Sequence, residues 1–172
     1  MVGDEEAQGL ADEIRPPGGG FTHNTKTGEP FKGRSGFAVS IRGAEQEHPA
    51  GEDVTREHIQ HYADVHQSFL RKAGHYLGGW HSDRPPASRF LDVSRIFQKK
   101  GRAGMAMVAN DQRAMMNMKD YSETHNPYRQ QHEAGLMSER QYGGLQAEAQ
   151  KRLDQPRPAS GQTKPGSRMW GH

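Results

Sequence analysis

Histidine, which can bind a metal ion or transfer a proton near neutral pH, is unusually frequent in this sequence. The chain has 10 His and no Cys, so a thiolate metal site and a thiol nucleophile are both excluded. His58 and His61 are three residues apart in a predicted helix, which places them on one face, and His75 or His81 could add a third ligand. No HExxH motif supports this site, and half-burial of His66 with solvation of the others is the simpler interpretation. We therefore expect no metal and no cofactor.

A second group of reactive side chains lies in the predicted strands around residues 75–95. Asp92 and Ser94 are two residues apart in a strand, so they share one of its faces. His75 or His81 could act as a general base, with Arg95 stabilising an anion. Such sets arise often by chance on neighbouring strands, so we assign no catalytic residue and favour a role other than catalysis.

The elements that position these residues alternate between strand and helix patterns. Phe37, Val39 and Ile41 follow a period of two, whereas the apolar residues between Ile59 and Ala73 recur three and four apart. The expected elements are, in order, a strand at 36–41, a helix at 55–73, strands at 75–81 and 89–97, a helix at 102–110 and a strand at 114–118. This β-α-β-β-α-β order predicts a small α+β domain over 36–120, with the two middle strands paired as an antiparallel hairpin.

The two ends of the chain differ from this middle in charge and in content of Gly and Pro. Residues 1–20 carry five acidic side chains against Arg15, and residues 151–172 carry five basic ones against Asp154. Such segments bury too little apolar surface to offset the entropy of ordering. We therefore expect an extended acidic N-terminal arm over 1–35 and a C-terminal arm over 121–172. A short helix near 138–153, interrupted by two Gly, would need a partner to be stable.

Composition excludes several classes of protein. The residues AVILMFWYC make up 31% of the chain, and no stretch approaches the roughly 18 apolar residues that span a bilayer. The start, MVGDEEAQGLADEIR, lacks the basic and apolar regions of a secretory signal, so we expect a protein that is made and assembled inside a cell. A net charge of +2 is too small to indicate a nucleic-acid partner by itself.

The arms are the expected partner-binding parts, because aromatic and aliphatic side chains carry most interface energy and charges set orientation. The candidate partner-binding residues are Phe21, Phe31, Tyr128, Tyr142, Leu145, Arg157, Lys164, Arg168 and Trp170. A protein partner is favoured over nucleic acid, since the few basic residues of the C-terminal arm would give weak, salt-sensitive binding.

Four short motifs give the chain a resemblance to a known family. GFAVS at 36–40, LGGW at 77–80, LDVSR at 91–95 and NDQRA at 110–114 resemble a small α+β domain encoded by tailed bacteriophages and prophages of actinobacteria. The resemblance covers about half of the chain and supplies no catalytic residues. That domain often lies among head-morphogenesis products, so the resemblance implies a virion or head-assembly context.

These observations predict a bacteriophage virion structural protein, a minor capsid or decoration protein, located in the virion and in the host cytoplasm during assembly. Its expected partners are the major capsid protein or other virion subunits, with self-association also open. Two alternatives remain: a toxin-like phage enzyme of the nuclease or ADP-ribosyltransferase type, and a nucleic-acid-binding internal virion protein.

Overall fold

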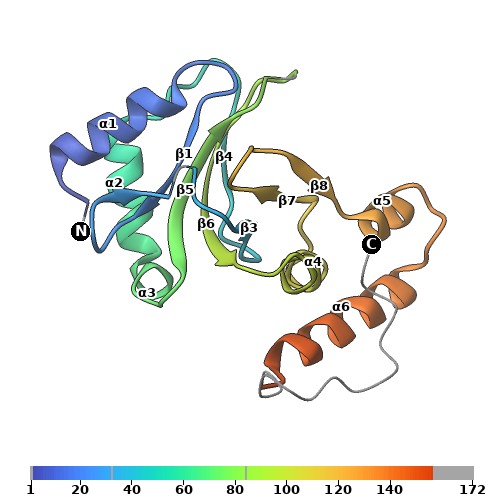
Figure 1. Cartoon of the computed structure of the whole chain (residues 1–172). Helices are drawn as coiled ribbons and strands as arrows, with labels where there is room; N and C mark the ends of the chain where they lie inside the picture. Colours follow the sequence, from blue (N-terminus) through green and yellow to red (C-terminus); the bar gives the residue numbers. More distant parts are fainter. Residues whose placement is uncertain (1, 32, 84, 157–172) are drawn as a thin grey trace.

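The computed structural model describes residues 2–31, 33–83 and 85–156, and its centre is one antiparallel β-sheet (Figure 1). The strands are β1 (Gly20–Asn24), β2 (Glu29–Pro30), β3 (Phe37–Ser40), β4 (Gln46–His48), β5 (His75–His81), β6 (Arg89–Phe97), β7 (Ala114–Asn117) and β8 (Glu123–His125). The helices are α1 (Asp4–Ile14), α2 (Arg56–Val65), α3 (Gln67–Leu70), α4 (Lys100–Ala109), α5 (Pro127–Glu133) and α6 (Glu139–Asp154).

The sheet is organised around β6, its longest strand. The strand order is β2-β1-β5-β6-β3-β7-β8, and β4 also pairs with β6. One edge of β6 pairs along its length with β5, from His75 opposite Arg95 to His81 opposite Arg89. The other edge is shared, because β3 pairs with its second half and β4 with its first. The strand at 89–97 therefore holds three other strands in register.

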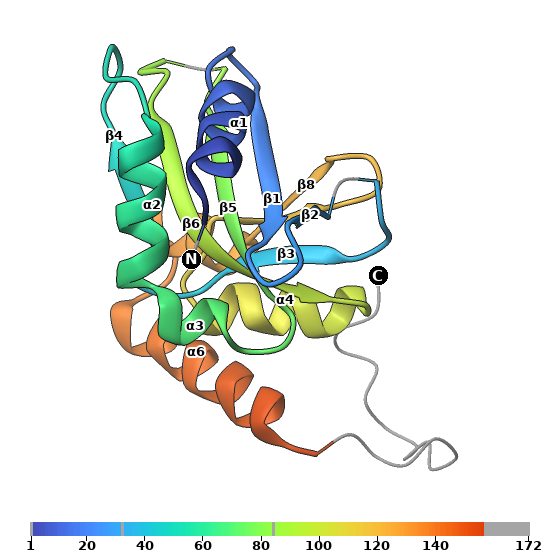
Figure 2. The same ribbon diagram turned by 90° about the vertical axis from the view of Figure 1, so that its left-hand side faces the viewer.

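Helices α1, α2 and α3 lie together on one side of the sheet, in front of it in Figure 2. Their apolar residues form the largest core cluster with Leu77, Leu91 and Val93, which are all fully buried. Helix α4 packs on Val39 and Phe97. Since residues 91, 93 and 97 alternate on one side of β6, all four helices cover the same face, which we call the helical face. The other side of β6, with Phe90, Asp92, Ser94 and Ile96, is called the opposite face.

The predicted α+β class is confirmed, as are most of the elements expected between residues 36 and 120. Thr55 caps α2, its hydroxyl accepting a hydrogen bond from the His58 amide at 3.4 Å. The expected single helix to Ala73 is interrupted at His66, and the short α3 follows. Strands β5 and β6 form the expected antiparallel pair. The expectation omitted β4, a short strand without an apolar pattern.

The prediction of an extended N-terminal arm over 1–35 is wrong. This segment contains α1 and β1, and β1 pairs with β5 from Gly20 opposite Trp80 to His23 opposite Leu77. The buried side of α1, with Leu10 and Ile14, belongs to the main core cluster. The acidic residues of the first turn, Asp4, Glu5 and Glu6, lie at a helix N-terminus, where the helix dipole favours negative charge.

The C-terminal arm is also largely folded as far as residue 156. The expected helix near 138–153 is present as α6, and Ser138 caps it. Its stabilising partner is α4 of the same chain: Ala149 packs against Val108 and Ala109, and Arg102 donates a 2.8 Å hydrogen bond to the Leu153 carbonyl. Among the described residues, no helix is both long enough and apolar enough to cross a bilayer.

Candidate functional site

The aromatic residues expected to bind partners lie mostly inside the fold. Phe21 and Phe31 are 8% and 7% exposed, so their selection as surface anchors is wrong. Phe21 packs into the main core, and Phe31 meets the Tyr76 ring edge-on at a centroid distance of 5.0 Å. Both side chains are buried because β1, which contains Phe21, and β2, which Phe31 follows, form one edge of the sheet.

Tyr128, Tyr142 and Leu145, the candidates after residue 120 that the structure describes, pack among the C-terminal helices. Tyr142 is 3% exposed, and its hydroxyl donates to Asp111 Oδ1 at 2.8 Å. Tyr128 and Leu145 are half-buried against the α4 and α6 contact. The remaining candidates, Arg157, Lys164, Arg168 and Trp170, lie outside the described residues.

The reactive set expected on the hairpin is not brought together. His75 and His81 pair across the strands with Arg95 and Arg89, so they lie on the helical face. Asp92 lies on the opposite face. His81 is 6% exposed, and its Nδ1 lies 2.9 Å from the Arg15 carbonyl at the end of α1. A histidine base and Asp92 acting from one side are therefore excluded by the strand alternation.

The structure instead gathers residues from all four motifs around Asp92. Ser40 and Ser94 both donate hydroxyl hydrogen bonds to its carboxylate, Ser94 at 3.2 Å, and Gly78 lies directly opposite on β5. Asn110 donates from Nδ2 to the Ser40 carbonyl at 3.2 Å. These residues come from GFAVS, LGGW, LDVSR and NDQRA in turn, so the four motifs specify one buried polar centre.

Burial raises the pKa of the Asp92 carboxyl, while the two serine hydroxyls partly oppose this by stabilising the carboxylate. Glu45, on the loop between β3 and β4, has its pKa raised by partial burial and by the charge of Asp92. The guanidinium groups of Arg113 and Arg129 act on Glu45 in the opposite direction. Two carboxyls with raised pKa values thus lie in this region, and two arginines act on one of them. Sequence reasoning missed this group except for Asp92.

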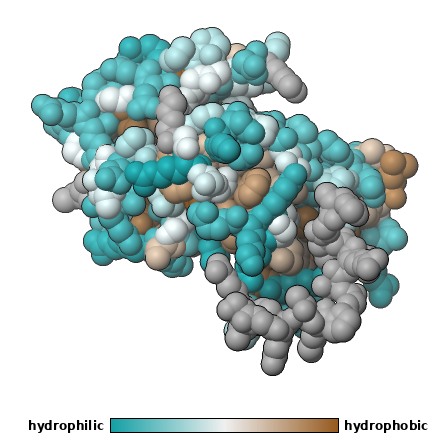
Figure 3. Space-filling model, in the orientation of Figure 1, coloured by the Kyte–Doolittle hydropathy of each residue, from teal (hydrophilic) through white to brown (hydrophobic). Residues whose placement is uncertain are grey.

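Beside this centre, the opposite face carries an aromatic pair that reaches the surface. The Trp80 and Phe90 rings are stacked, with centroids 4.5 Å apart and planes at 13°. Trp80 is 41% exposed. The face of the molecule shown in Figure 3 is mostly hydrophilic, with hydrophobic side chains in small patches. Trp80 and Phe90 are directly opposite each other on β5 and β6, two positions from Gly78 and Asp92. The stack is a flat, rigid apolar surface adjoining the motif centre.

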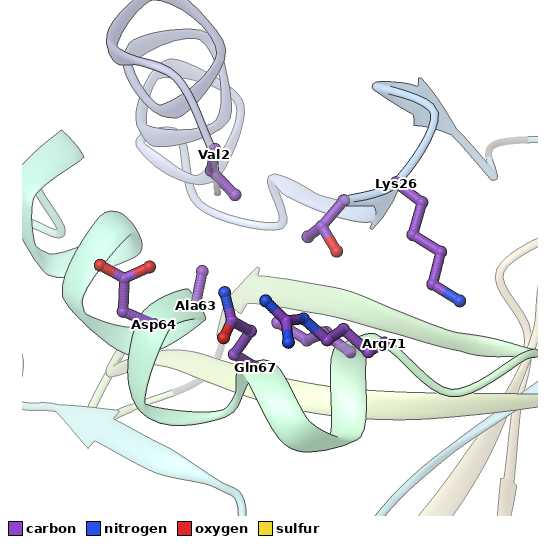
Figure 4. Close-up of a pocket in the computed structure, with 8 residues that line it drawn as sticks. Val2, Lys26, Ala63, Asp64, Gln67 and Arg71 are labelled. Carbon is purple, nitrogen blue, oxygen red and sulfur yellow. The ribbon is translucent and has the colours of Figure 1, made fainter.

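A cavity lies elsewhere, on the helical side. It measures about 330 Å³ and is lined by Val2, the turn after β1 and the junction of α2 with α3. Figure 4 shows the Gln67 amide and the Arg71 guanidinium near its centre, with Lys26 across from Asp64. Its size is at the lower end of the range for small-molecule sites, about 300–1,000 Å³. The charged rim suits a small polar ligand, but none of the four motifs lines it.

Of the histidines weighed as metal ligands in the sequence, His61 is exposed. His66, expected to be half-buried, is half-buried, and its ring lies against Tyr62 with centroids 4.3 Å apart and planes at 40°, where burial lowers its pKa. His58 instead approaches His48, which lies on β4. His48 was absent from the sequence candidates because β4 has no recognisable pattern.

No family model, no curated protein and no solved structure matches this chain.

Proposed function

We propose that this chain is a bacteriophage virion structural protein, a minor capsid or decoration protein that binds a neighbouring virion subunit. The observation that carries the proposal is the exposed Trp80 ring stacked on Phe90, beside the motif centre. Tryptophan is enriched among residues that dominate protein interfaces, and a ring already held by a stack loses little freedom on binding. The major capsid protein is the proposed partner.

The proposal also rests on the resemblance of the four motifs to the phage head-region domain. LGGW lies on β5, LDVSR on β6 and GFAVS on β3, and NDQRA covers the turn from α4 into β7. Residues of all four motifs lie in or beside one hydrogen-bonded centre. Trp80 is itself the last residue of LGGW, so the proposed contact belongs to the same unit.

Charge supplies the second contribution to partner binding. Residues 157–172 contain Arg157, Lys164 and Arg168 and no acidic residue, and they follow directly after the described end of the chain. A basic segment and an exposed aromatic ring on one chain suit a subunit that offers both an acidic surface and an apolar recess. The charges would set orientation and salt sensitivity, while the Trp80 contact provides most of the affinity.

The test is incorporation into particles assembled in the presence of each variant, quantified by mass spectrometry of purified virions. Trp80→Ala should reduce the copy number at least tenfold, and removal of 157–172 should reduce it most at low salt, where the attraction between charges is least screened. Tyr121→Ala is the matched control, since Tyr121 is 45% exposed but lies outside the motif centre. Absence of the unmodified chain from particles, or equal incorporation of Trp80→Ala and Tyr121→Ala, would overturn the proposal.

One observation favours an enzyme as the second candidate. Asp92 and Glu45 both have raised pKa values, and Arg113 and Arg129 act on Glu45, a combination that suits acid–base chemistry on an anionic substrate. A toxin-like nuclease or ADP-ribosyltransferase would require turnover of RNA or NAD that Glu45→Gln abolishes. Particle incorporation without such turnover excludes this candidate.

A further inference from the structure

Three potential metal ligands converge where β4 leads into α2, at the edge of the sheet. His48 is the last residue of β4, Glu52 lies in the following loop, and His58 is in the first turn of α2. One ligand atom from each of the three lies within 4.8 Å of the other two. The His48 and His58 rings are 4.9 Å apart, with their planes at 38°.

His48 is the residue of the cluster that has an unsatisfied buried ring nitrogen. Its side chain is 3% exposed, and its Nε2 is buried without a hydrogen-bond partner among the described residues. Its Nδ1 lies 3.2 Å from Glu52 Oε1. A buried imidazole nitrogen left unpaired is unfavourable, because it gives up its hydration and receives nothing in return.

Glu52 and His58 can move to complete a coordination sphere. Tetrahedral zinc with bonds of about 2.1 Å separates its ligand atoms by about 3.4 Å, so the group must contract by roughly 1 Å. The Glu52 side chain is 51% exposed and His58 is half-buried, so both can change rotamer without disturbing the core. His58 Nδ1 receives a long hydrogen bond of 3.3 Å from the Thr55 amide, which water can replace at this exposed position.

The charged side chains on the elements that pack around the cluster have partners other than the Glu52 carboxylate. Arg89 of β6 is opposite His48, but its guanidinium is paired with Asp53 at 3.1 Å. It also donates to the Glu52 carbonyl at 2.9 Å and not to the Glu52 carboxylate. Glu57 is paired with Arg56 at 2.7 Å. The carboxylate of Glu52 therefore remains free to accept a cation.

We propose that His48, Glu52 and His58 form a binding site for a divalent transition metal of the zinc class. Two imidazoles and one carboxylate are a donor set that zinc accepts, with water filling the remaining position. The metal would tie the loop 49–55 to both β4 and α2, so its effect is to stabilise this corner of the fold. This site is independent of the Trp80 contact, and either can hold without the other.

The experiment is titration of the untagged full-length chain with ZnCl₂ by calorimetry, and with CoCl₂ by visible absorption. We expect one saturable equivalent, a rise in Tm with zinc and reversal by chelator. The ¹⁵N signals of the His48 and His58 rings should shift on binding, because coordination engages the lone pair of the ligated ring nitrogen.

Variants separate this site from the other histidines. His58→Gln and Glu52→Gln should each weaken zinc binding at least tenfold and remove the rise in Tm. His61→Gln, exposed on the same helix and outside the cluster, should bind within twofold of the unmodified chain. His48→Gln tests the buried ligand, and if it fails to fold the other two variants still decide. Absence of a saturable equivalent, or equal losses in His58→Gln and His61→Gln, overturns the proposal.

Discussion

The carboxyl group of Asp92 occupies the space that a side chain at Gly78 would fill. The two residues are directly opposite each other on β6 and β5. A Cβ added to Gly78 would lie 2.0 Å from Asp92 Oδ1 and 3.0 Å from its Cγ. The glycine of LGGW and the aspartate of LDVSR are thus one structural feature: the missing side chain of one makes room for the buried carboxyl of the other.

Gly78→Ala should therefore be strongly destabilising. The added methyl group forces Asp92 into another rotamer and separates it from the hydroxyls of Ser40 and Ser94, so we expect the free energy of unfolding to fall by about 2–4 kcal/mol. Urea unfolding at neutral pH measures the change. Gly104→Ala in α4 is the control, because a Cβ there meets nothing within 4 Å, and it should stabilise by about 0.5–1 kcal/mol. Equal stability of the two variants would contradict the steric conflict.

Asp92→Asn should change the pH dependence of stability. Burial raises the pKa of Asp92 in the folded state, so the folded chain binds the proton more tightly than the unfolded chain. Its contribution to stability is present at low pH and is lost as pH rises above the unfolded value of about 3.9. The stability of Asp92→Asn relative to the unmodified chain should therefore increase as pH rises above about 4. Parallel pH profiles from urea unfolding would contradict this.

Ala149→Leu should disrupt the docking of α6 on α4. Ala149 is 2% exposed and packs on Val108 and Ala109, so a larger side chain has no space without displacing the helix. We expect a loss of about 1–3 kcal/mol in thermal or urea unfolding. Ala147→Leu, exposed on the same helix, should stay within about 0.5 kcal/mol. A similar effect of both substitutions would show that α6 is not packed through Ala149.

Deletion of residues 1–31 should abolish cooperative folding. The segment contributes Leu10, Ile14 and Phe21 to the main core, and burial of each such side chain stabilises by roughly 1.5–3 kcal/mol. Their sum, with the lost pairing of β1 and β5, matches the whole stability of a typical domain. Deletion of 157–172 is the comparison, since all residues of the described core clusters precede that segment. A cooperative transition after the N-terminal deletion, measured by circular dichroism, would contradict this account.

Local patterns in the sequence were sufficient for the elements that carry a strong periodicity or a cap. Alternation predicted β3 and β6, and Thr55 and Ser138 mark the starts of α2 and α6 as they would in any protein. The same reasoning failed for residues 1–35. Acidic and Gly-rich composition there outweighed the apolar spacing of Ala7, Leu10, Ala11 and Ile14, although that spacing places all four on the buried side of α1.

The reactive sites depended on contacts that local patterns do not contain. The shared face of Asp92 and Ser94 follows from strand alternation alone. Their meeting with Ser40, and the approach of His48 to His58, required the pairing of β6 with β3 and β4, which joins residues about 50 positions apart in the sequence.

The sequence by itself determined the class of fold, the central hairpin and the starts of α2 and α6, because hydrophobic period and capping act over a few neighbouring residues. Only the tertiary structure decided that the chain's first residues complete the core, that α6 has its partner in α4, and which histidines meet. Those outcomes depend on the burial of surfaces distant in the chain, and the free energy of that burial is set by which faces come together.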